Sequence, residues 1–147
     1  IESRGLGDVY KRQTFNYWHF ALDIFQILKW RETMASQFFH VHHYVKPGMA
    51  SQWWEKVGGL MSDQSAMGKY VQDCMDLGFF NHSFMPVAQE GPMFCIWEAK
   101  EGVTEAEFQE FIDGPLGPDF GTGAINNSIS KIDLELTGGQ APYERKL

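Results

Sequence analysis

The sequence has few cysteines, few basic residues and no long uninterrupted apolar run. Cys74 and Cys95 are its only cysteines, and they form no CxxC or zinc-finger spacing. We therefore expect two buried free thiols in a reducing compartment, with a cytoplasmic location. Twelve Lys and Arg against nineteen Asp and Glu give a net charge of −7, which argues against nucleic acids and anionic membrane surfaces as partners.

The first residues of the chain lack the periodicity of a folded domain. Residues 1–13 follow neither a helical nor a strand pattern, and their GLGDVYKRQ stretch resembles adapter sequence translated in transcriptome assemblies. We therefore expect residues 1–33 to be a non-native or disordered extension, with Met34 as a plausible start. The alternative is a genuine amphipathic helix from Phe15 to Trp30, which is too short and too polar to span a membrane.

The remaining sequence predicts one domain over residues 34–137, followed by a disordered tail over residues 138–147. Apolar and β-branched runs between Gly and Pro turns predict four strands, over residues 38–45, 79–87, 93–99 and 128–136. Helical spacing predicts a first helix from Ser51, broken near Ser62, with Ser62 or Ser65 capping a second segment that ends at Gly78. A last helix starts at a capping box made by Thr104 and Glu107 and stops before Gly114 and Pro115.

The predicted element order is βαββαβ, which is typical of the ferredoxin-like α+β fold. Such a chain forms a four-stranded antiparallel sheet with helices on one face. The uncovered face is usually buried against a second copy of the chain, so we expect a C2 homodimer.

One short motif links this pattern to a known group of proteins. The first strand ends in Tyr44-Val45-Lys46-Pro47-Gly48, directly before the first helix. This ending, together with the element order over residues 37–136, resembles the dimeric α/β-barrel superfamily of antibiotic-biosynthesis-type monooxygenases, stress-responsive A/B-barrel proteins and polyketide cyclases. The resemblance implies a small-molecule cavity between sheet and helices, and chemistry that needs no organic cofactor.

Three of the five histidines lie in the first predicted strand. His40 and His42 share one face, about 7 Å apart, and His43 lies on the other. No cofactor is expected. A divalent transition metal is the alternative, with His40, His42, His82 and Glu98 as its candidate ligands.

Imidazole is the side chain best suited to proton transfer near neutral pH. The candidate catalytic residues are therefore His43, His82 and His42. We expect Val41, His43 and Val45 to face the helices, although the opposite face is almost as well suited to line the cavity. The candidate ligand-binding residues are His40, Asn81, Trp53, Trp54, Phe84 and Trp97, although core packing explains most of the aromatic side chains better.

The loop over residues 112–123 carries two Gly-Pro steps and connects the last helix to the last strand. It is either a lid over the cavity mouth or a rigid connector that packs Phe120. Its Gly121-Thr122-Gly123 sequence is too short and misplaced for a dinucleotide-binding loop.

Three functions remain open on these observations. The first is a cofactor-independent enzyme of monooxygenase, cyclase or isomerase type, acting on an apolar oxygenated small molecule. The second is a ligand- or metal-binding dimer without catalysis. The third is an interaction module in which the histidines only pack.

Overall fold

The computed structural model describes residues 35–147. The expected N-terminal extension, its alternative helix and the start at Met34 lie outside the described residues. Within the described part, the chain forms a four-stranded antiparallel sheet and three α-helices, which confirms the α+β class and is compatible with the ferredoxin-like arrangement. The elements are β1 (Gln37–Val45), α2 (Ala50–Ser62), α3 (Gln64–Asp76), β2 (Phe79–Pro86), β3 (Met93–Ala99), α4 (Glu105–Asp113), β4 (Ile125–Lys131) and the 3₁₀-helix η1 (Leu134–Thr137).

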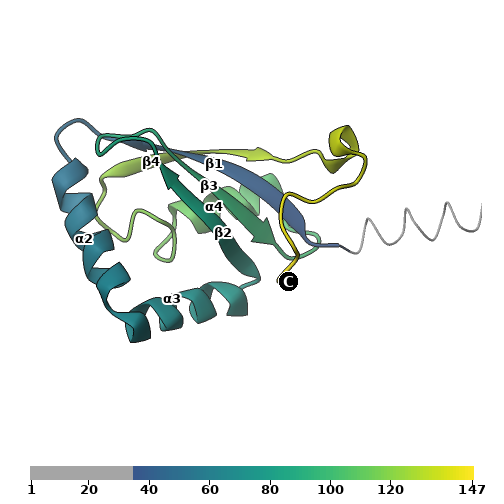
Figure 1. Ribbon diagram of the computed structural model, residues 1–147, viewed down its shortest axis with the longest axis horizontal. Helices are drawn as coiled ribbons and strands as arrows, with labels where there is room; N and C mark the ends of the chain where they lie inside the picture. The colour runs from purple at the N-terminus through teal and green to yellow at the C-terminus, as the bar shows by residue number, and fades with distance from the viewer. Residues whose placement is uncertain (1–34) are drawn as a thin grey trace, which may run out of the picture. The chain divides into compact units, whose positions relative to one another are not determined.

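The strand order is β2-β3-β1-β4, so β1 and β3 form the centre of the sheet (Figure 1). His40 pairs with Ile96 of β3 on one side and with Ser130 of β4 on the other. This register puts Val41, His43 and Val45 on one face of the sheet, and His40 and His42 on the opposite face.

The helices cover the face that carries Val41 and His43. The core there has two parts, one centred on β1, β3 and α4 and the other on α2 and the start of β4. Phe39 stacks on Phe108 of α4 with ring centroids 4.1 Å apart, and Trp53 of α2 packs in the second part. No helix among the described residues has the length and apolar character needed to span a membrane.

The predicted break in the first helical segment is present, but its cap differs from the prediction. Asp63, rather than Ser62 or Ser65, caps α3, because its carboxylate accepts the backbone N–H groups of Ser65 and Ala66. Gly78 follows the cap residue of α3 with φ +88°, a conformation that favours glycine. The capping box of Thr104 and Glu107 is formed as predicted.

The last strand lies about three residues earlier than predicted. It spans Ile125–Lys131, and Leu134 and Leu136 of the predicted range belong instead to η1. Asparagine is depleted in strands, so Asn126 and Asn127 are predicted to lie in the loop before the strand. Tertiary pairing overrides that preference, since these residues lie opposite Tyr44 and His43 of β1.

The C-terminal segment contacts the sheet, which contradicts the expectation of a disordered tail. It returns to the start of β1 (Figure 1), where the Lys146 backbone N–H donates to Glu98 on the face opposite the helices. Tyr143 stacks on His82, with ring centroids 5.0 Å apart, and the Arg145 guanidinium lies over the Phe38 ring. The uncovered sheet face is therefore partly occupied by the chain itself.

Candidate functional site

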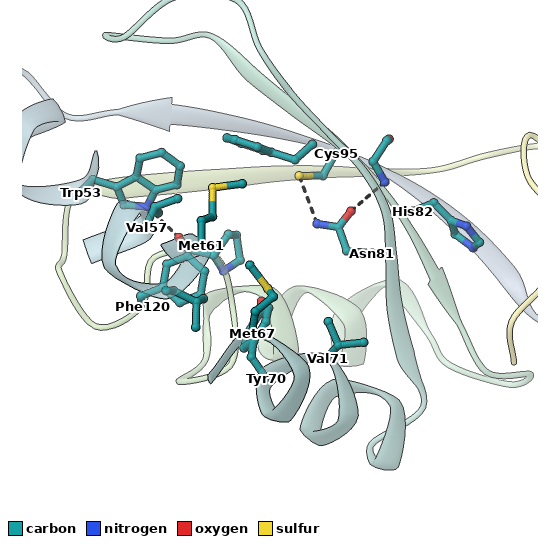
Figure 2. Close-up of a pocket in the computed structure, with 14 residues that line it drawn as sticks. Trp53, Val57, Met61, Met67, Tyr70, Val71, Asn81, His82, Cys95 and Phe120 are labelled. Atoms are coloured by element: carbon teal, nitrogen blue, oxygen red, sulfur yellow. Dashed lines mark hydrogen bonds between the residues drawn. The ribbon is translucent and has the colours of Figure 1, made fainter. Parts of the chain in front are cut away.

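A cavity of about 250 Å³ lies between the helix-facing side of the sheet and the helices α2 and α3 (Figure 2). We call it the sheet–helix cavity. Its walls come from α2, α3, β2, β3 and the loop before β4. The lining residues are Trp53, Val57, Leu60, Met61, Met67, Tyr70, Val71, Asn81, His82, Ser83, Phe84, Cys95, Pro118 and Phe120.

Most of this lining is apolar, and the polar groups gather at its β2 and β3 side. The Asn81 amide oxygen accepts the Ser83 backbone N–H at 3.0 Å, and its nitrogen lies 3.6 Å from the Cys95 sulfur (Figure 2). Burial raises the pKa of the Cys95 thiol to about 12, and the contact with Asn81 opposes this only in part. Cys95 therefore remains a neutral thiol at physiological pH, and it is poorly suited to act as a nucleophile.

Tyr70 contributes a further polar group to the cavity, from α3. Its hydroxyl donates to the carbonyl of Leu116 at 3.0 Å, and burial raises its pKa. The hydroxyl is therefore neutral, and its oxygen retains lone pairs for a ligand.

The loop before β4 forms a fixed wall of the cavity. Trp53 donates its indole N–H to the carbonyl of Pro118 at 2.7 Å. The Asp119 carboxylate accepts the backbone N–H groups of Gly123 and Ile125 at 2.7 and 3.0 Å. Phe120 lines the cavity with a left-handed backbone, at φ 52°. These bonds favour the connector interpretation of the loop over the lid.

His82 joins the edge of the cavity to the opposite side of the sheet. Its Nε2 lies 2.8 Å from the Glu98 carboxylate, which is fully buried. The carboxylate also accepts hydrogen bonds from the Ser36 hydroxyl and from the backbone N–H groups of Lys146 and Leu147. Burial alone would raise the pKa of Glu98, but these hydrogen bonds outweigh it and hold the pKa below its usual value.

His43 lies on the helix-facing side of β1, but it is not among the residues that line the cavity. Its side chain is 1% exposed, and its Nδ1 lies 2.6 Å from Oδ1 of Asn127. Burial lowers the pKa of His43, although the bond to Asn127 opposes that effect. The imidazole is thus held neutral in the core.

His40 and His42 occupy the opposite sheet face. Both pack against Phe94, with ring centroids 5.5 and 4.7 Å from it, and His42 also packs on Tyr44. Within residues 35–147, no three His, Cys, Asp or Glu side chains come together in a way that could hold a metal ion. The alternative set of His40, His42, His82 and Glu98 is therefore not assembled, because only His82 and Glu98 meet.

The remaining predicted ligand-binding residues divide in the same way. Trp53, Asn81 and Phe84 line the cavity. Trp54 instead donates its indole N–H to the carbonyl of Gln89, and Trp97 packs edge-on against Phe111 under α4.

Sequence reasoning missed several lining residues on α2, α3 and the loop, chiefly Met61, Met67, Tyr70 and Phe120. Helical spacing puts Met67 and Tyr70 on the inner face of α3. No sequence signal separates a lining residue from a core residue on such a face.

The model of the family described as "Domain of unknown function (DUF8652)" matches residues 38–140, and the chain belongs to this family. Neither the curated proteins nor the solved structures contain a match to the chain.

Proposed function

We propose that this chain, a member of that family, binds a small and largely apolar molecule in the sheet–helix cavity. The observation that carries the proposal is the cavity itself, whose walls are mostly apolar and carry a few polar groups, most of them on β2 and β3. Its volume of about 250 Å³ matches roughly eight waters, or an organic molecule of about ten non-hydrogen atoms. A ferredoxin-like domain with its cavity between sheet and helices is part of this proposal.

Propiophenone is a suitable probe because it has ten non-hydrogen atoms by its formula, an apolar body and one oxygen. We expect saturation-transfer NMR and a change in tryptophan fluorescence to detect its binding, since Trp53 lines the cavity. Val71→Phe should fill the cavity and weaken binding by about tenfold or more. The matched control is Val87→Phe, at a side chain that is 68% exposed after β2. Equal binding by both variants would contradict the proposed site.

Proton transfer by His82 is a second candidate function, favoured by its contact with Glu98. A carboxylate that accepts the Nε2–H fixes the imidazole tautomer and leaves Nδ1 as a base. His82 is also the one histidine that lines the cavity among the described residues. In this reading Glu98 is a positioning residue and no cofactor takes part.

Exchange of the α-hydrogens of propiophenone in D₂O tests this second function without knowledge of the natural substrate. We expect NMR to show exchange that is faster with the protein than in buffer and slower with His82→Phe. His42→Phe, at a side chain that does not line the cavity, is the control. Exchange at the buffer rate with the wild-type protein would leave binding as the function.

A homodimer that covers the open sheet face belongs to the same proposal. The Tyr44 and Met85 side chains there are 50% and 43% exposed, and Phe94 lies between β1 and β2. An exposed aromatic and apolar strip on a sheet is the kind of surface that a C2 partner buries. We expect light scattering to give the mass of two chains, and Tyr44→Glu to give that of one. Leu136→Glu, at an 85% exposed position in η1, should leave the mass unchanged.

The proposed location of this dimer is the cytoplasm. Cys74 and Cys95 are both free and buried, which suits a compartment that keeps thiols reduced. A fluorescent fusion imaged in the cell of origin would test this location.

A further inference from the structure

We infer that the sheet–helix cavity selects neutral molecules with a hydrogen-bond-accepting oxygen, such as an aryl or alkyl ketone, and that the Asn81 amide nitrogen recognises this oxygen. The inference rests on the proposed function, because it names the chemical class of the ligand for the same cavity. Its basis is the orientation of one amide and the charge of the lining.

The orientation of the Asn81 amide is fixed by a neighbour that can only donate. The backbone N–H of Ser83 lies 3.0 Å from Oδ1 of Asn81, so the oxygen must face it and the amide nitrogen must face the other way. A bulge between Asn81 and Ser83 holds both residues in this arrangement. The amide nitrogen therefore points towards Cys95 and the cavity (Figure 2).

This nitrogen has more donor capacity than its protein contacts use. It carries two hydrogens, and its contact in the structure is the Cys95 sulfur at 3.6 Å, a weak acceptor. Ser83 adds a second group at the same side, since its hydroxyl oxygen accepts the Ile96 N–H and its hydrogen is left to donate. A ligand oxygen placed there would accept a hydrogen bond from the Asn81 amide nitrogen or the Ser83 hydroxyl.

The lining also disfavours charged ligands of both signs. Within residues 35–147, no Lys, Arg, Asp or Glu lines the cavity. Cys95 and Tyr70 remain neutral because burial raises the pKa of each. The imidazole Nε2 of His82 is committed to Glu98. A carboxylate or an ammonium group would therefore lose its hydration without gaining a partner of opposite charge.

Four ligands of nearly equal size separate the possibilities at pH 7: propiophenone, propylbenzene, 3-phenylpropanoate and 3-phenylpropylamine. With the wild-type chain, we expect titration by NMR or calorimetry to give at least tenfold tighter binding of propiophenone than of either charged ligand. We also expect propylbenzene to bind several-fold more weakly than propiophenone, because it lacks the oxygen.

Asn81→Asp is the sharpest variant because it keeps an oxygen for the Ser83 N–H and replaces the donor by an acceptor. The variant should bind propiophenone about tenfold or more weakly than the wild-type chain does, and should bind 3-phenylpropylamine more tightly. Asn126→Asp, the same change at an exposed position of β4, should leave both affinities unchanged. An independent test in the wild-type chain is the ¹⁵N shift of the Asn81 side-chain amide, which should move with propiophenone and stay in place with propylbenzene.

The outcomes distinguish this inference from the proposed function. If 3-phenylpropanoate or propylbenzene binds as tightly as propiophenone, or the Asn81 amide signal does not respond to the ketone, the neutral-acceptor inference is overturned while ligand binding stands. If none of the four ligands binds, both fail together.

Discussion

The Nδ1 atom of His43 lies 2.6 Å from Oδ1 of Asn127, and this pair fixes the protonation state of a buried imidazole. The Asn127 amide nitrogen donates to the carbonyl of Ile112 and to the carboxylate of Asp113, at 3.2 and 2.8 Å. Its oxygen must therefore accept, so Nδ1 of His43 carries the hydrogen. Nε2 then carries a lone pair that has no hydrogen-bond donor among the described residues.

This arrangement predicts a loss of stability in mild acid. Burial lowers the pKa of His43 from 6.5 in the folded chain, so the unfolded chain binds the proton more readily. The contribution is fully present above pH 6.5 and is lost as the pH falls below it, with a slope of up to about 1.4 kcal/mol per pH unit.

His43→Gln keeps a donor for Asn127 and cannot titrate. We therefore expect the difference in free energy of unfolding between wild type and variant to shrink between pH 7.5 and pH 5, measured by urea unfolding. An identical pH dependence of the two proteins would contradict a neutral buried His43.

The order of strands and helices was predictable because each element carries its own local signal. Residue types alone predicted β1, the bounds of β3 and the capping box of α4, and the structure confirms all three. The start of β4 was not predictable, because Asn126 and Asn127 form a strand only through their pairing with β1. The C-terminal segment is held against the sheet by hydrogen bonds to the buried Glu98 carboxylate. No local sequence pattern reveals these bonds.

The candidate site was predictable only as far as its place in the fold. The cavity lies between sheet and helices, and Asn81, Trp53 and Phe84 are among its lining residues. The dense histidine strand drew attention to β1, whereas the cavity is built on β2 and β3. Sequence spacing gives the face on which a side chain lies, but the position of a cavity along that face depends on the angle of α2 and α3.

Removal of the Glu98 carboxylate should destabilise the fold and release the C-terminal segment. Glu98→Ala leaves four donors without their acceptor, including the backbone N–H groups of Lys146 and Leu147. We expect a loss of about 3 kcal/mol in the free energy of unfolding, and faster hydrogen exchange at the Lys146 amide. Glu101→Ala, at an exposed position two residues after β3, is the control. Similar losses in both variants would show that the Glu98 network contributes little.

The two thiols should resist modification until the chain opens. Cys74 and Cys95 are 2% and 1% exposed, and burial raises their pKa values to about 11 and about 12. At pH 8 we expect a thiol-reactive disulfide reagent to label the unfolded chain in full and the folded chain only at the rate of its opening. Saturating propiophenone should slow the labelling of Cys95. The Cys74→Ala variant makes this measurable, because Cys95 is then the thiol that reacts. Fast labelling in the absence of denaturant would contradict the burial of these thiols.

Gly117 determines whether the loop can form the wall of the cavity. A Cβ atom at this position would lie 1.9 Å from the carbonyl oxygen of Ile112, and backbone cannot yield as a flexible side chain does. Gly117→Ala must therefore move the loop that carries Pro118 and Phe120, and we expect it to lower the free energy of unfolding by about 2 kcal/mol or more and to weaken propiophenone binding.

Gly58→Ala is the matched comparison, because a Cβ atom there meets no atom within 4 Å and the residue lies inside α2. Alanine is the better helix former, so this change should raise the free energy of unfolding by about 1 kcal/mol and leave binding unchanged. The two substitutions add the same methyl group. Chemical unfolding of both proteins separates the effect of a clash in the loop from the effect of higher helix propensity in α2. If Gly117→Ala matched Gly58→Ala in stability and affinity, the close approach of residues 117 and 112 would not hold the cavity wall in place.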